Sequence, residues 1–235
     1  MFFDPVYFMF VGPFFLLSMW ASFKVKSSFK KWSSYRNSLG MTGAQIARTM
    51  LDRNGLHDVK VEHVHGSLSD HYDPSSRTLR LSDDTYASNS IAAAGVAAHE
   101  AGHAIQHKVN YPLLTFRSTI VPLASFGSNL SWILIMIGMG MMFFLGSIGY
   151  YVALAGVIFF GVVVIFQIVT VPVEIDASNR AKKSLPAMGI ASSQEQEAVS
   201  DVLNAAAWTY VAAAFTAVAT LLYFLLRLGL LGGRN

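Results

Sequence analysis

Seven histidines occur in the chain, all between His57 and His107, and two of them belong to the stretch His99-Glu100-Ala101-Gly102-His103. This stretch has the pattern H-E-x-x-H. Side chains four residues apart on a helix project from the same face, with Cβ atoms about 5 to 6 Å apart. His99 and His103 can therefore share one Zn²⁺, with each ring nitrogen about 2.0 to 2.1 Å from the ion. The spacing predicts a zinc site with one ion per chain.

Glu100 follows His99 directly and so lies about 100° around the same helix. Its carboxylate is then expected beside the metal and not on it. From that position a carboxylate can take a proton from a water activated by zinc and pass it to a leaving amine. Zinc lowers the pKa of its water to about 7 and polarises a scissile carbonyl. The residue types therefore predict peptide hydrolysis, with Glu100 as the general base.

A catalytic zinc has three protein ligands and one open position. The chain has no cysteine, so the third ligand must be His, Asp or Glu. His107 is two turns from His99, about 12 Å along the helix axis, and is expected to be a supporting or exposed polar group. Glu174 and Asp176 are the downstream candidates. Residues two apart face different sides of a helix, so only one of the two is expected to bind the metal.

The elements that must position these residues follow from the charge pattern. Three segments carry no charged residue: 5–23, 118–173 and 202–226. A spanning helix needs about 20 mostly apolar residues, so the middle segment is long enough for two, with a turn near residues 146–151. Four spans are predicted, near residues 4–23, 123–145, 150–171 and 205–226. This pattern excludes an ordinary soluble protein and also a fully embedded one.

The spans predict an order of segments along the chain. That order is an N-terminal anchor (1–23), a catalytic segment (24–117), a two-helix hairpin (118–173), a segment with the third zinc ligand (174–204), and a final span with a short tail (205–235). The chain is expected to lie in the plasma membrane. Residues 24–117 hold 12 of the 17 Lys and Arg, so the positive-inside rule predicts that this segment faces the cytoplasm. Two spans separate the polar segments, which must then share one side.

Local signals predict three helices in the polar segments. A capping box at Thr42-Gly43-Ala44-Gln45 begins one, residues 89–108 form the second, and a third begins at Ser192 or Ser193 and continues into the last span. The fold class is therefore a mainly α membrane protein with four transmembrane helices and a small α+β, zincin-like catalytic segment.

Alternating apolar residues predict two strands, at residues 59–64 and 79–81, joined by a long polar loop into a small hairpin or a mixed sheet. The strand at residues 78–82 is either a core strand or an edge that pairs with an extended substrate. His71, in the loop, either polarises a substrate carbonyl or fixes the loop by a hydrogen bond. Glycines at 138, 140, 146, 156 and 161 are expected to allow close packing between helices.

At three motifs the chain resembles a known family, the YugP-like neutral zinc metallopeptidases of bacterial membranes. The motifs lie at residues 68–74, 95–107 and 174–181, the last with the form Glu174-x-x-Ala177-Ser178-x-Arg180-Ala181. The chain is more distantly similar to HtpX-type membrane proteases, whose last motif is Glu-x-x-Ala-Asp. The resemblance implies a gluzincin-like peptidase with Glu174, not Asp176, as the third zinc ligand. Ser178 stands where the distant family has Asp.

The combined prediction is a membrane zinc endopeptidase with His99, His103 and Glu174 as metal ligands. Its expected partners are the lipid bilayer and polypeptide substrates, including membrane or misfolded proteins. A regulatory membrane partner is left open, and no nucleic acid is expected. One alternative is an intramembrane metalloprotease with its zinc inside the bilayer. The other is a zinc-binding scaffold or quality-control adaptor without catalysis.

Overall fold

The computed structural model describes residues 4–231. Residues 1–3 of the predicted anchor and residues 232–235 of the predicted tail lie outside this range. The chain divides into two compact units, each built from separate stretches of sequence. We call residues 1–20, 116–171 and 210–235 the apolar unit, and residues 21–115 and 172–209 the polar unit.

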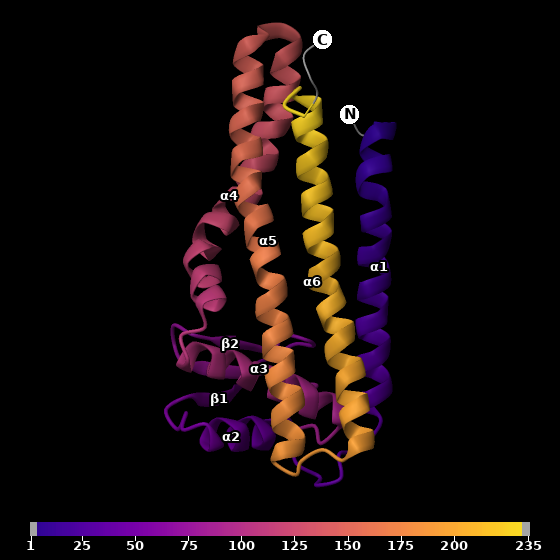
Figure 1. Cartoon of the computed structure of the whole chain (residues 1–235), viewed down its shortest axis with the longest axis vertical. Helices are drawn as coiled ribbons and strands as arrows, with labels where there is room; N and C mark the ends of the chain where they lie inside the picture. The colour runs from indigo at the N-terminus through magenta and orange to yellow at the C-terminus, as the bar shows by residue number, and fades with distance from the viewer. Residues whose placement is uncertain (1–3, 232–235) are drawn as a thin grey trace. The chain divides into compact units, whose positions relative to one another are not determined.

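Within the described range the chain forms six helices and three short strands (Figure 1). In chain order they are α1 (Pro5–Ser33), α2 (Gly43–Arg53), β1 (Lys60–His63), β2 (His71–Asp73), β3 (Thr78–Leu81), α3 (Ile91–Lys108), α4 (Pro112–Leu145), α5 (Ser147–Ala187) and α6 (Ser193–Arg227). By length and composition α1, α4, α5 and α6 qualify as membrane spans. Four spans were predicted, and the described part of the chain has the same number of candidate spans. The helices are longer than the predicted spans because each continues past its apolar run.

In the apolar unit, α4 and α5 form a hairpin whose turn is a single residue. Gly146 has φ +51°, a conformation that residues with a side chain rarely adopt, and α5 begins at the next residue, Ser147. The predicted turn at residues 146–151 is therefore correct in place but too long. A Cβ on Gly138 would overlap the backbone nitrogen of Ala153, so this glycine allows close packing as predicted. Gly140, Gly146 and Gly161 have open space around them, and for these three the packing prediction is wrong.

Polar contacts join α1 and α6 inside the apolar unit. The Tyr223 hydroxyl donates a hydrogen bond to the Asp4 carboxylate over 2.7 Å. The hydroxyls of Ser18 and Thr216 lie 3.2 Å apart. Polar groups in an apolar setting are costly unless paired, so these contacts favour one register of α1 against α6.

The sheet of the polar unit is mixed, with strand order β1-β3-β2. β1 pairs with β3 in parallel and β2 pairs with β3 antiparallel. The mixed-sheet alternative is thereby confirmed, and the simple hairpin is wrong because the predicted loop contains β2. β3 is the central strand, and Thr78, Leu79 and Leu81 are buried. It cannot serve as the substrate-pairing edge, so its role is that of a core strand.

The three predicted helices of the polar unit are present. Thr42 and Gln45 form the capping box of α2, and the Ser90 side chain accepts the N–H of Ala93 at the start of α3. α2 packs against α3 beside the sheet (Figure 1). α6 begins at Ser193, as predicted, and runs unbroken to Arg227.

One carboxylate joins α1 and α6 within the polar unit. Asp201 accepts hydrogen bonds from the Ser28 hydroxyl (2.6 Å) and the Trp32 indole (2.9 Å), and it pairs with Lys24 (3.3 Å). These donors hold the pKa of Asp201 below its usual value, with the Ser28 hydrogen bond as the largest cause. The ionised carboxylate is therefore a stabilising element of this unit.

Candidate metal centre

The site is built where α3 meets the part of α5 that belongs to the polar unit. A Cβ placed on Gly102 would lie 2.6 Å from the backbone oxygen of Ala177. Only a glycine allows the two helix backbones to approach this closely. Ala98 and Ala101 beside it are fully buried, so small side chains continue the contact. The glycine in the H-E-x-x-H stretch thus has a structural role that the pattern alone does not reveal.

This close approach brings His99, His103 and Glu174 together. His99 Nε2 lies 3.1 Å from Glu174 Oε2, and His103 Nε2 lies 3.4 Å from the same oxygen. One ligand atom from each residue lies within 4.8 Å of the other two. The side chains of His99, His103 and Glu174 are largely shielded from solvent, with exposed fractions of 13 %, 11 % and 3 %. Three donor atoms therefore converge on one small, shielded volume.

The second ring nitrogen of each histidine is held by a different partner. His103 Nδ1 lies 2.9 Å from Gln106 Oε1. The Gln106 amide nitrogen donates to the backbone oxygen of Val173, which identifies Oε1 as the acceptor and Nδ1 as the donor. His99 Nδ1 lies 3.1 Å from Ser178 Oγ. With Nδ1 engaged in this way, the Nε2 lone pairs are directed at the point that Glu174 also faces.

This donor set fits zinc. Two imidazole nitrogens and one carboxylate oxygen are a known ligand combination for catalytic Zn²⁺, which keeps a fourth position open. Histidines that bind metals almost always donate their other N–H to a carboxylate, carbonyl or similar acceptor, as His103 does to Gln106. The residues present therefore could hold the ion and also orient its ligands.

The pKa values of Glu100 and His103 are both raised, for different reasons. Burial raises the pKa of Glu100, while the charges of His99 and His103 act in the opposite direction. Burial also lowers the pKa of His103, but the hydrogen bond and charge of Glu174 outweigh it, so the net shift is upward.

The rival ligand Asp176 points into a separate network. Its Oδ2 accepts hydrogen bonds from Gln106 Nε2 (2.8 Å) and from Arg180 Nε (2.6 Å). The grouping of possible metal ligands contains Glu174 and not Asp176. Gln106 thus connects His103 on α3 to Asp176 on α5. Asp176 contacts Gln106 and reaches His103 only through it.

The two other histidines considered from the sequence lie apart from this cluster. His107 Nδ1 is 2.9 Å from the Tyr72 hydroxyl, so it acts as a supporting polar group. His71 Nδ1 donates to the backbone oxygen of Ser69 over 2.8 Å. This contact is the loop-fixing hydrogen bond that was one of the two roles considered for His71. In the described part of the chain neither residue joins the group around Glu174.

Gln106 and Ser178 are the positioning residues that the sequence did not assign. Gln106 follows His103 by three residues, a spacing that places both on one helix face. A polar residue at that spacing from a candidate ligand was the available signal in the sequence. The structure shows that Gln106 is fully buried. From the sequence, Ser178 was singled out only because the distant family has Asp at this position. In the structure its hydroxyl contacts His99.

Comparison with known proteins gives the family. The sequence model of a family described as "putative neutral zinc metallopeptidase" matches residues 7–229. The chain belongs to this family. A relative from Bacillus subtilis (strain 168) is named "Putative membrane protease YugP". It is 47 % identical over 210 residues, covering 89 % of this chain and 91 % of the relative. The family resemblance inferred from the sequence is therefore confirmed.

No solved structure matches the chain. The membership in the neutral zinc metallopeptidase family thus rests on sequence, and the geometry of the centre comes from this structure alone. Zinc as the metal follows from the family description together with the His and Glu donor set.

Proposed function

We propose that the protein is a membrane zinc endopeptidase that hydrolyses polypeptides at the cytoplasmic face of the membrane. The observation that carries the proposal is the convergence of His99, His103 and Glu174 within 4.8 Å, beside the buried Glu100. His99, His103 and Glu174 are the proposed zinc ligands. Zinc held there supplies a Lewis acid that polarises the scissile carbonyl and lowers the pKa of water.

The chain's own residues have defined tasks in this proposal. Glu100 accepts the proton of the attacking water and returns it to the leaving amine nitrogen. Its burial raises its pKa, which moves a carboxylate toward the range in which a base can also act as an acid. Gln106 and Ser178 hold the two imidazole rings in the orientation that leaves both Nε2 atoms toward Glu174.

The test compares wild type with Glu100→Gln, in detergent, on an unfolded protein such as casein. The glutamine is close in shape and cannot accept the proton, so cleavage should fall by at least about 10²-fold while zinc remains bound. Glu197→Gln, at an exposed glutamate of α6, is the matched control and should retain full activity. Full proteolysis by Glu100→Gln would refute the assignment, as would equal loss in both variants. An inactive wild type that binds zinc, with Glu100→Gln behaving normally in cells, would instead support the scaffold alternative.

The cytoplasmic location is tested separately. The chain contains no cysteine, so single cysteines placed at the exposed positions Ser67 and Ser193 report on their own surroundings. Both are expected to react with a membrane-impermeant maleimide in inside-out vesicles and not in intact cells. Reaction of either position from outside the cell would contradict the proposed orientation.

The intramembrane alternative predicts that the motif helix crosses the bilayer. α3, which carries His99 and His103, is not among the described helices that qualify as spans by length and composition. Single cysteines at the exposed positions Ala87, just before α3, and Lys108, its last residue, test this directly. Reaction of the two from opposite sides of the membrane would favour this alternative, and reaction of both from the cytoplasmic side alone would contradict it.

A further inference from the structure

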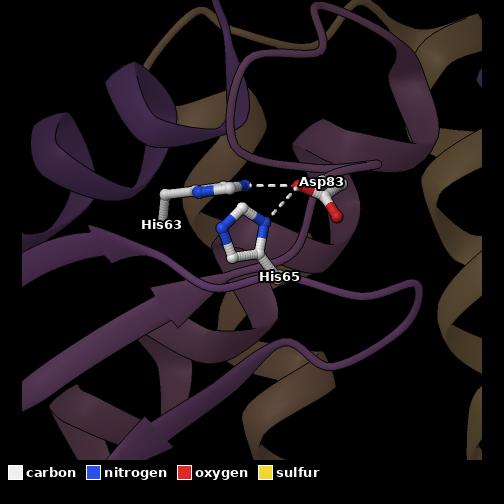
Figure 2. Close-up of side chains that lie close together, drawn as sticks. All are labelled: His63, His65 and Asp83. Carbon is white, nitrogen blue, oxygen red and sulfur yellow. Dashed lines mark hydrogen bonds and ion pairs between the residues drawn. The ribbon is translucent and has the colours of Figure 1, made fainter.

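A second group of possible metal ligands lies in the polar unit and shares no residue with the group around Glu174. It consists of His63, His65 and Asp83, and one donor atom from each lies within 4.8 Å of the others. His63 is the last residue of β1, and Asp83 follows β3 by two residues. Figure 2 shows both imidazole rings directed at the same carboxylate oxygen. Nothing in the proposed catalytic reaction uses these residues.

The parallel pairing of β1 with β3 explains why the three residues meet. The register places His63 beside Leu81. Backbone hydrogen bonds continue the pairing beyond the strands, from Val64 N to Leu81 O (2.9 Å) and from Asp83 N to Gly66 O (3.1 Å). Residues two apart on extended backbone point to the same side, so His63 and His65 both face the Asp83 side chain.

The carboxylate of Asp83 is held in place by the backbone. Gly66 N–H donates to Oδ2 over 2.9 Å, which leaves Oδ1 toward the two rings. His63 Nε2 lies 2.6 Å from Oδ1 and His65 Nδ1 lies 3.6 Å from the same atom. The oxygen is thus an oriented ligand of the kind that metal sites contain.

We propose that His63 Nε2, His65 Nδ1 and Asp83 Oδ1 form a second site for Zn²⁺ or a similar divalent transition-metal ion. Two imidazoles and one carboxylate are a zinc ligand set, and water completes the coordination. Ligands about 2.0 to 2.2 Å from a tetrahedral ion lie roughly 3.3 to 3.5 Å apart, so modest ring rotations close the site. The His65 side chain is 94 % exposed, so its ring turns without disturbing the core.

Exposure makes this site different in kind from the buried centre. The side chains of His63, His65 and Asp83 are 36 %, 94 % and 52 % exposed. The ion is therefore expected to bind more weakly than at Glu174 and to exchange with solution. It would fasten the segment after β1 to the turn after β3. Ser82, next to Asp83, already donates two hydrogen bonds to Asp70 at the other end of that segment (2.8 and 2.9 Å).

The test is zinc stoichiometry on the full chain in detergent, purified without a polyhistidine tag and titrated with buffered free Zn²⁺ from nanomolar to micromolar. Wild type is expected to bind two ions with separable affinities, and the double variant His63→Gln/His65→Gln only the tighter one. His57→Gln is the matched control. His57 is also exposed and pairs with a single carboxylate, Asp52 (3.1 Å), but belongs to no three-residue group among the described residues. It should still bind two ions.

Two further variants distinguish zinc binding at the second site from zinc binding at the buried centre. His65→Gln alone, at the most exposed member of the group, should weaken the second site at least tenfold. His99→Ala/His103→Ala should lose the tighter ion and keep the weaker one, which separates this proposal from that of the catalytic centre. Equal zinc binding by wild type and His63→Gln/His65→Gln, or an unchanged affinity in His65→Gln, would overturn the proposal.

Discussion

The contact between Gly102 and Ala177 gives the sharpest prediction about the candidate metal centre. In Gly102→Ala the new Cβ would lie 2.6 Å from the Ala177 backbone oxygen. An ordinary carbon–oxygen contact is about 3.3 to 3.6 Å, so α3 and α5 must separate by roughly 0.7 to 1 Å. Neither partner can yield by rotating a side chain, because the atom opposed is backbone.

The expected cost in stability is small because two effects oppose each other. Overpacking of a core contact costs about 1 to 3 kcal/mol. Replacing a helix-interior glycine by alanine contributes about 1 kcal/mol in the other direction. The net loss is therefore about 0 to 2 kcal/mol, and the variant should still fold.

The expected cost in activity is much larger. Metal–ligand distances tolerate about 0.2 Å, whereas the shift would move His99 and His103 on α3 away from Glu174 on α5 by several times that amount. A displacement of about 1 Å at a reacting centre can cost about 10²-fold. We therefore expect kcat/KM on casein to fall at least 10²-fold, with reduced zinc affinity, while the thermal midpoint changes by only a few degrees.

Gly95→Ala on the same helix is the matched control. Its Cβ would lie 3.4 Å from Val199 Cγ1, an ordinary contact with a side chain. This variant should keep its activity and zinc, with equal or slightly higher stability because alanine favours the helix. The reasoning is refuted if Gly102→Ala retains at least half of the wild-type kcat/KM, or if Gly95→Ala loses as much.

The third ligand, the metal and the Asp73 carboxylate can each be tested on the full chain. Glu174→Gln should lower zinc affinity and cleavage at least 10²-fold, whereas Asp176→Asn should lose less than tenfold, because Asp176 reaches the centre only through a hydrogen bond. Elemental analysis with the casein assay decides, and the reverse order would make Asp176 the ligand. A zinc chelator should abolish cleavage and added Zn²⁺ should restore it; cleavage that survives chelation contradicts a metal mechanism. Finally, hydrogen bonds from Ser75, and next from Ser76, hold the pKa of Asp73 below its usual 3.8. Stability from this charge is present above about pH 4 and lost as the pH falls further. Asp73→Asn should therefore lower the thermal midpoint by about 2 to 4 °C at pH 7, and the difference should shrink below pH 4; a constant difference would exclude this cause.

Much of the helical architecture could be predicted because its signals are local. The uncharged runs determine the four candidate spans, and the Thr42–Gln45 capping box marks the start of α2. Helix lengths were underestimated because an apolar run reports only the part suited to lipid, while α5 continues through Pro172 to Ala187.

The sheet was only partly predictable because strand order depends on long-range pairing. β2 consists of three residues, His71–Asp73, in a polar stretch without alternating apolar positions. Its backbone becomes a strand because it pairs with β3, which also makes β3 the central strand. Pairing partners distant in sequence leave no periodic signal within such a short segment.

The amino-acid pattern was enough to predict that His99 and His103 share a helix face and that Glu100 lies beside them, because helical periodicity is a local property. It left Glu174 and Asp176 as candidates for a third ligand, and the family resemblance favoured Glu174. The full set of groups around the centre depends on how two helices distant in sequence pack against each other. The tertiary structure placed Glu174 with the histidines and Asp176 with Gln106, because the rotation of α5 against α3 selects which side chains face inward. That rotation depends on a backbone contact at Gly102, which no one-dimensional pattern encodes.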